Sequence, residues 1–408
     1  LYVGWILFFL KMRREVDYRA FQQLSDNKDS LIEMIQGMAE IKLQGSDLKR
    51  RWKWAHIQAR LFRTQVKALA ISQYQDVGAL SINQLKDIII TFLAARQVLV
   101  GEMTLGMMLA IQYIIGQLNG PLQQLIGFMR AAQDAKISFE RLAEIHNTRN
   151  EEEADVQKLS VIPPGDIKIE RLSFRYTPIS EDVLADVSLT IPVGKTTAIV
   201  GSSGSGKTTL IKLLLGFYEP TAGNISIGGQ SLSSIYTKVW RKQCGVVMQD
   251  GFIFSDTIAN NIAESDDHTD IFKVREAAQQ ANILEFITGL PLGMHTMIGP
   301  KGNGISQGQR QRLFIARAIY KNPGFLFFDE ATNALDATNE KIIMQNLNRF
   351  LSGKTAVIVA HRLSTVKHAD QIIVLKHGKI VESGQHHELV QARGTYYELV
   401  KNQLELGA

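Results

Sequence analysis

The segment from Gly201 to Thr208, GSSGSGKT, has the residue types and spacing of a phosphate-binding loop, G-x-x-x-x-G-K-[ST]. Its glycines let the backbone curl so that N–H groups point at phosphate oxygens, and the start of the following helix favours an anion. The lysine would reach the β- and γ-phosphates, and the threonine hydroxyl would bind Mg²⁺. We therefore predict an ATP·Mg site rather than a glycine turn without a ligand. The predicted ATP-binding residues of this loop are Gly201, Ser202, Ser203, Gly204, Ser205, Gly206, Lys207, Thr208 and Thr209.

Two adjacent carboxylates follow the apolar run 325–328. Asp329 fits the acid that holds Mg²⁺ in nucleotidases with such a loop. Glu330 would point to another side and suits a general base that orients the attacking water. The four apolar residues before the pair make a surface turn a weak alternative. His361 follows another strand-like run and would lie near the γ-phosphate, although a lone histidine is more often structural.

Alternating strand-like and helix-like segments position these residues. Ile167–Tyr176 alternates apolar and polar residues as a half-buried strand does. Short apolar runs at 197–200, 325–328, 355–360 and 371–375 are typical of buried parallel strands. We predict an α/β domain with a mainly parallel sheet. The single cysteine, Cys244, lies in the apolar run CGVVM and is expected to be a packed strand residue, and with one cysteine no disulfide can form within the chain.

The N-terminal third of the chain has the pattern of membrane helices. Residues 103–129 carry no charge, and this segment is long enough to cross a bilayer of about 30 Å as a helix. The apolar stretch 77–100 precedes it and predicts a hairpin that turns at 101–104. Lys and Arg are frequent from 11 to 67 and absent between Arg96 and Arg130, which predicts a cytosolic 11–67 and an external turn. Lys86 and Asp87 interrupt the first helix, either at depth or near the surface.

Residues 15–75 are predicted to be helical, with a break and a new helix start at Gly45-Ser46-Asp47. Lys49, Arg50, Arg51 and Lys53 surround Trp52 and Trp54. We expect this segment to be a short cytosolic helix that docks on another domain, not a nucleic-acid surface. The formal net charge is only +5, and its basic excess lies near apolar spans. The charged, proline-containing stretch 147–164 is predicted to be a linker.

The run Gly304-Ile305-Ser306-Gln307-Gly308-Gln309-Arg310-Gln311-Arg312 resembles the signature motif of ATP-binding cassette (ABC) proteins. Residues 165–405 as a whole resemble their nucleotide-binding domain. Residues 15–145 resemble the last intracellular loop and final two membrane helices of ABC exporters. The segment 249–263 (QDGFIFSDTIANNIA) and the signature run look most like those of peptidase-containing exporters of peptides and bacteriocins. The resemblance implies an all-α membrane-domain fragment followed by an α/β nucleotide-binding cassette. The implied boundaries are 1–146 for the membrane part (end of the fourth membrane helix, loop 15–75, helices 77–100 and 103–129), 147–164 for the linker and 165–408 for the cassette.

The resemblance also implies roles for single residues. Tyr176 would stack on adenine, and Gln249 would contact Mg²⁺ and face the membrane domain. His361 would be the switch histidine, and Asp336 would cross the interface to a second cassette. The contacts to the partner's nucleotide would come from Ser306, Gln307, Gly308 and Gln309. Gln307 replaces a glycine of the usual signature and Asn333 a common serine, yet Glu330 and His361 are present, so we expect an active site.

One signature and one phosphate loop per chain imply a dimer, either with a second copy of the chain or with a paralogous half-transporter. The expected activity is ATP hydrolysis coupled to export through the cytoplasmic (inner) membrane, with the cassette in the cytosol. The expected partners are membrane lipid, a peptide substrate and a periplasmic adaptor, with no nucleic acid. A lipid or multidrug exporter is the alternative within the class. A gated channel, or an ABC ATPase of DNA repair or translation that does not transport, is the alternative outside it.

Overall fold

The computed structural model describes residues 2–148, 150–151, 158–299, 302, 304–330, 337–360 and 366–405. The chain divides into two compact units. The helical unit is Leu1–Thr148 and the α/β unit is Arg149–Ala408. Each unit is described in turn.

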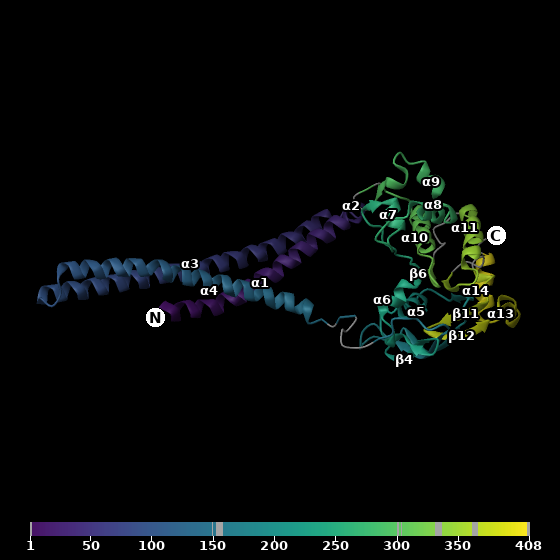
Figure 1. The fold of residues 1–408 in the computed structure, drawn as a ribbon, viewed down its shortest axis with the longest axis horizontal. Coiled ribbons are helices and arrows are strands. Elements are labelled where there is room, and N and C mark those ends of the chain that lie inside the picture. Colours follow the sequence, from purple (N-terminus) through teal and green to yellow (C-terminus); the bar gives the residue numbers. More distant parts are fainter. Residues whose placement is uncertain are drawn as a thin grey trace. The chain divides into compact units, whose positions relative to one another are not determined.

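The helical unit consists of long helices that run side by side (Figure 1). A short α2 separates the first two long helices, between breaks at Gly37 and at residues 44–46. The described helices are α1 Tyr2–Gln36, α2 Met38–Leu43, α3 Asp47–Val100 and α4 Leu105–His146. The predicted helix start at Asp47 is confirmed, with Ser46 as the residue before it. The prediction of a short helix there is wrong, because α3 continues for 54 residues.

Polar contacts join α1 to the first turns of α3. Trp54 Nε1 and Gln58 Nε2 both donate to Asn27 Oδ1, at 3.0 Å and 2.7 Å. Arg50 pairs with Glu33 at 2.7 Å, and Lys53 lies 3.7 Å from the same carboxylate. The basic cluster predicted around Trp52 is therefore partly neutralised within its own unit. This favours a role in helix packing over a role in binding nucleic acid.

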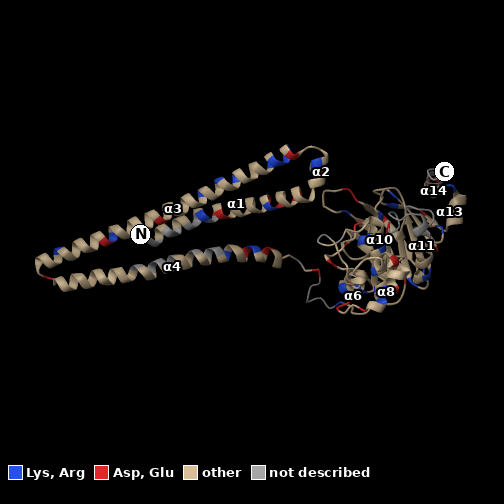
Figure 2. Ribbon diagram, turned by 90° about the horizontal axis from the view of Figure 1, so that it is seen from above, with Lys and Arg blue, Asp and Glu red and all other residues tan. Residues whose placement is uncertain are grey.

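The turn between α3 and α4 is the predicted one. Gly101 ends α3 in the left-handed conformation, and the Thr104 side chain caps α4 by accepting from the Met107 N–H. Among the described helices, α3 is long and apolar enough to cross a membrane, and Leu105–Leu118 of α4 is a shorter apolar stretch. Lys and Arg gather in the α2 end of α3 and thin out toward the turn (Figure 2).

Toward the turn, α3 and α4 expose large apolar side chains, among them Phe92, Leu99 and Leu105, with Leu99 89% exposed. Such a surface requires lipid or another protein to cover it. Within α3, Lys86 Nζ lies 3.2 Å from Asp87 Oδ1, so these two charges at least partly neutralise one another.

The α/β unit is built on a six-stranded sheet in the order β12-β11-β3-β10-β9-β6. Its strands are parallel apart from β12, which runs antiparallel to β11. These strands are β3 Thr196–Val200, β6 Cys244–Val247, β9 Phe325–Asp329, β10 Thr355–Val359, β11 Gln371–Lys376 and β12 Lys379–Gly384. The predicted mainly parallel sheet is confirmed, with strand ends within one or two residues of those expected.

A second, antiparallel sheet has the order β2-β1-β4-β5, and β7 and β8 form a small pair. These strands are β1 Ile167–Phe174, β2 Leu184–Ile191, β4 Ala222–Ile227, β5 Gln230–Ser231, β7 Asp256–Thr257 and β8 Met297–Ile298. The helices of the unit are α5 Lys207–Leu214, α6 Thr237–Lys242, α7 Ile258–Ile262, α8 Ile271–Gln280, α9 Leu284–Thr288, α10 Gln307–Lys321, α11 Ala337–Leu351, α13 His386–Ala392 and α14 Thr395–Glu405.

The parallel sheet is buried on both faces. In β9, Leu326 and Phe328 pack into one hydrophobic cluster with α8 and α10, whereas Phe327 packs into a second cluster with α5 and β1. This two-sided burial explains why these strands read as continuous apolar runs. Cys244 is buried in β6, as predicted, and burial raises the pKa of its thiol, so it is held as a packing residue.

Candidate functional site

The loop between β3 and α5 is shaped by glycines that no other residue could replace without strain. A Cβ at Gly201 would lie 2.1 Å from the Leu375 carbonyl oxygen. Gly206 has a φ of +100°, and its Cβ would lie 2.7 Å from Leu184 Cδ2. Gly206 is also the residue immediately before α5. The loop therefore brings its backbone to the start of a helix, where N–H groups are available to an anion.

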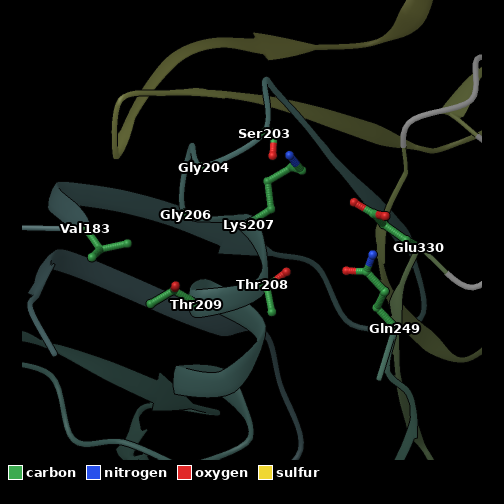
Figure 3. Close-up of a pocket in the computed structure, with 9 residues that line it drawn as sticks. All are labelled: Val183, Ser203, Gly204, Gly206, Lys207, Thr208, Thr209, Gln249 and Glu330. Carbon is green, nitrogen blue, oxygen red and sulfur yellow. The ribbon is translucent and has the colours of Figure 1, made fainter. Parts of the chain in front are cut away.

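A pocket of about 480 Å³ lies at this loop. Figure 3 shows Lys207 and Thr208 on one side and the side chains of Glu330 and Gln249 projecting toward them from the other. The lining residues are Val183, Ser203, Gly204, Gly206, Lys207, Thr208, Thr209, Gln249 and Glu330. The structure thus brings together residues that lie more than a hundred positions apart in the sequence. Val183 was missed, because an apolar residue before a strand carries no chemical signal.

Lys207 is held inside the loop, with an exposed fraction of 6%. Its ammonium donates to the carbonyl oxygens of Gly201 at 3.0 Å and Ser202 at 2.8 Å. Burial lowers the pKa of Lys207, and the negative charges of Glu330 and Asp329 oppose that shift. A phosphate would offer this buried cation a stronger partner than two carbonyl oxygens.

Asp329 ends β9 with an exposed fraction of 0%. No described residue donates a hydrogen bond of good geometry to either of its carboxylate oxygens, although the Thr208 side chain is close enough to act on them. Burial raises the pKa of Asp329, against the lowering effects of Thr208 and Lys207. An unsatisfied buried carboxylate is costly on its own but fits a hard cation with oxygen ligands, with Thr208 and Gln249 nearby to contribute. Among the described residues no group of three or more His, Cys, Asp and Glu gathers, so hydroxyl and amide oxygens would have to complete such a site.

Glu330 has a backbone conformation that is rare for a residue with a side chain. Its φ is +52°. Its N–H donates to the Val359 carbonyl oxygen at 3.0 Å, and its own carbonyl oxygen accepts from Gln311 Nε2 at 2.8 Å. One bond comes from β10 and the other from α10. The kink directs the Glu330 side chain into the pocket, away from the buried Asp329 that precedes it.

Tyr176 lies next to the loop rather than in the pocket lining. Its hydroxyl and that of Thr209 are 3.0 Å apart, within hydrogen-bond distance. Its ring packs edge-on against Tyr218, with centroids 5.3 Å apart. The residue is 47% exposed, and its ring also packs edge-on against Phe174.

The signature residues lie at the start of α10 and do not line the pocket. The Ser306 hydroxyl accepts from the Gln309 N–H at 3.2 Å, and Gln309 Oε1 accepts from the Ser306 N–H at 2.8 Å. This capping box satisfies two donors at the helix start. Gln307, the unusual signature residue, is exposed at the first position of α10, and Gly308 is half-buried beside it. Asp336 and His361 lie outside the described residues.

Comparison with known proteins places both units. The family model described as "ABC transporter transmembrane region" matches residues 1–122. The family model described as "ABC transporter" matches residues 184–333. The chain carries a transmembrane region and an ATP-binding domain of ABC transporters. The two matches indicate a membrane-embedded part followed by an ATP-binding domain.

Relatives and a solved structure agree with this assignment. The leukotoxin translocation ATP-binding protein LktB of Mannheimia haemolytica is 37% identical over 406 residues, which is 99% of this chain and 57% of that protein. The protein of the same name from Bibersteinia trehalosi gives the same values. The chain thus spans a little over half the length of these curated relatives. The structure of a bacterial Atm1-family ABC exporter with ATP bound matches with a TM-score of 0.93 and 29% identity, over 98% of this chain and 70% of that chain. The fold is that of an ABC exporter.

Proposed function

We propose that this chain belongs to an exporter in which ATP hydrolysis drives a peptide substrate across the cytoplasmic membrane. The pocket at the 201–208 loop carries this proposal, because it places a buried lysine opposite a carboxylate in a chain that also has a transmembrane region. The alternative of an ABC ATPase that does not transport has no use for such a region.

Nucleotide binding rests on the loop and on Lys207. The ammonium would leave the carbonyl oxygens of Gly201 and Ser202 for the β- and γ-phosphates. The backbone N–H groups of the loop would hold the other phosphate oxygens. Tyr176 would stack on adenine, and its bond to Thr209 would fix the ring close to the loop.

Mg²⁺ fits the oxygen atoms of Asp329, Thr208 and Gln249. The two unsatisfied oxygens of Asp329 support this assignment, because they need either a cation or a proton. When bound, the ion neutralises charge that develops on the phosphate oxygens. The protein supplies the rest of the chemistry by orienting groups around the phosphate.

Glu330 is proposed as the general base. Its carboxylate lines the pocket opposite Lys207, where it can accept a proton from a water molecule that attacks the γ-phosphate. His361 is proposed to contact the same phosphate. The conformation of Glu330, kinked and bonded to β10 and α10, keeps the carboxylate directed at that position.

The second half of each site is proposed to come from a second subunit. Ser306, Gln307, Gly308 and Gln309 lie at the start of α10 and are not part of the pocket in their own chain. They would therefore meet the nucleotide of a partner, which is a second copy or a paralogous half-transporter, with Asp336 crossing the same interface. The likeness to a solved ABC exporter is consistent with a dimer.

A peptide is the proposed substrate class, because the relatives at 37% identity are described as leukotoxin translocation proteins. A periplasmic adaptor and a location in the inner membrane belong to the same proposal. Lipids or drugs are the second candidates, since the fold is shared with an ABC exporter of another family, which matches over 98% of this chain, and does not itself select a peptide.

The test measures ATP hydrolysis by the intact protein in lipid nanodiscs, with and without added probes. A pool of unstructured casein peptides should raise the rate, whereas rhodamine 6G at the same concentration should not. Stimulation by the dye alone would move the assignment to drug export. No hydrolysis with ATP and Mg²⁺ would contradict the proposed function as a whole.

A further inference from the structure

A hydrogen bond links the helix that carries the signature to the backbone of Glu330. Gln311, in the second turn of α10, donates from Nε2 to the Glu330 carbonyl oxygen at 2.8 Å. Gln311 is only two residues beyond Gln309, whose side chain completes the capping box with Ser306. The start of α10 and Glu330, which follows β9, are therefore joined directly, although we propose that they act at different nucleotide sites.

The bond acts at a point where the backbone needs support. The positive φ of Glu330 is unfavourable for a residue with a Cβ and persists only when surrounding contacts enforce it. Two long-range bonds hold the residue, the Val359 carbonyl on its N–H and the Gln311 amide on its carbonyl oxygen. The bond to Val359 belongs to the sheet. The bond from Gln311 belongs to α10 and would change if the start of that helix moved.

Other contacts keep α10 a single rigid element. Arg312 Nη1 donates to the Asn282 carbonyl oxygen at 2.7 Å, and Arg317 Nε donates to the Asn261 carbonyl oxygen at 2.8 Å. The helix also buries Leu313, Phe314 and Ile315 in the hydrophobic cluster. These contacts anchor α10 from Arg312 onward. A ligand at Ser306 would therefore act on the first turns of the helix, which include Gln311.

We propose that Gln311 is a positioning residue for Glu330, which aligns this carboxylate when the signature of the same chain engages the partner's nucleotide. The inference rests on the proposed function, in which Ser306 serves the opposite site. Binding at one site would then prepare the base of the other site, with Gln311 as the connection. Gln311 itself does not contact the nucleotide.

The test compares variants of the intact protein that keep or remove the donor. Gln311→Glu preserves shape but replaces the amide N–H by an oxygen that faces a carbonyl oxygen. Gln311→Met removes the donor without adding charge, and Gln311→Lys restores a donor of similar reach. Gln279→Glu is the matched control, because Gln279 is exposed on α8. Turnover is expressed per bound ATP, so that misfolded protein does not count.

Gln311→Glu and Gln311→Met should lower kcat by about tenfold with an unchanged KM for ATP, the cost of one lost bond to a positioned group. Gln311→Lys should recover most of the loss, and the control should match the unmutated protein. A kcat within twofold of the unmutated value in both donor-free variants would overturn the inference. So would an equal loss in Gln311→Lys. Glu330→Gln in the same series separates the two claims, since an active protein silenced by Glu330→Gln but indifferent to Gln311 contradicts only this inference.

Discussion

The two motifs of the α/β unit that we propose to bind phosphate are built very differently. The 201–208 loop already has its partners, because Lys207, Gln249 and Glu330 from three segments meet in one pocket. The start of α10 satisfies its own donors, since Ser306 and Gln309 cap one another and neither lines the pocket at the 201–208 loop. The contrast supports the proposal that the loop and the start of α10 belong to different nucleotide sites. The predictions below test that contrast.

The largest loss of ATP hydrolysis is expected from a substitution in the pocket at the 201–208 loop. Glu330→Gln removes the proposed base while keeping the size of the side chain and the backbone bonds that hold it. Hydrolysis should fall by at least a hundredfold, within the usual range for a general base, while ATP binding is retained. The measurement is steady-state hydrolysis together with binding of a fluorescent ATP analogue. Turnover near the unmutated rate would remove Glu330 from this role.

The signature side should respond in a different way. Ser306→Ala removes both the proposed phosphate contact and the helix cap, which by itself costs about 0.5–2 kcal/mol of stability. We expect hydrolysis to fall at least tenfold, about the loss of one bond to a charged group, with normal ATP binding in the loop of the same chain. Ser306→Asn is the control for the cap, since asparagine also caps well. Equal, full activity in both variants would show that the hydroxyl contacts no nucleotide.

The buried carboxylate of the pocket predicts a pH dependence. Burial raises the pKa of Asp329 in the folded protein above its ordinary value, so between these two values the folded state holds a proton that the unfolded state has lost. Stability from this group therefore falls as the pH rises through that window. Without Mg²⁺, Asp329→Asn should have a Tm a few degrees higher than the unmutated protein at pH 8 and the same Tm near pH 4. A constant Tm difference across this range would contradict the prediction.

The smallest effect is expected at the edge of the pocket. Tyr176→Phe keeps the proposed stacking ring and loses the bond to Thr209. A lost bond of this kind is worth about 1 kcal/mol, so KM for ATP should rise by roughly fivefold with little change in kcat. Tyr176→Ala, which removes the ring as well, should raise KM much further. Identical KM values in the two variants would exclude stacking.

The pocket was largely predictable because its signals are local. The order of glycines around Lys207 and the apolar run before Asp329 each fix a loop or a strand end within a few residues. Parallel strands then bring their carboxyl ends to one edge of the sheet, so the meeting of Lys207 and Glu330 follows from topology. The same reasoning applies to Cys244 in β6.

What could not be predicted depends on contacts between distant segments or on where a periodic pattern stops. The bond from Gln311 to Glu330 exists because α10 approaches the end of β9, and a glutamine in a helix gives no sign of its partner. The short helix expected after Gly45 proved to be part of α3, because the same periodicity continues to Val100 without a break. The fold-back of Lys207 onto its loop is likewise visible only in the structure.

The contrast between the two motifs is tested most directly by mixing two inactive variants. Lys207→Ala removes the phosphate-binding lysine of the loop, and Ser306→Ala removes the proposed phosphate contact of the signature. Neither variant alone should therefore form a fully working site. Co-expressed, they form dimers in which the intact loop of one chain meets the intact signature of the other. Random pairing gives one working site in half of the dimers, so two independent sites predict about a quarter of the unmutated rate of ATP hydrolysis. Coupling through Gln311 would lower this value, because the working site then uses Glu330 of the chain whose signature is altered. A mixture no more active than the separate variants would contradict the shared site.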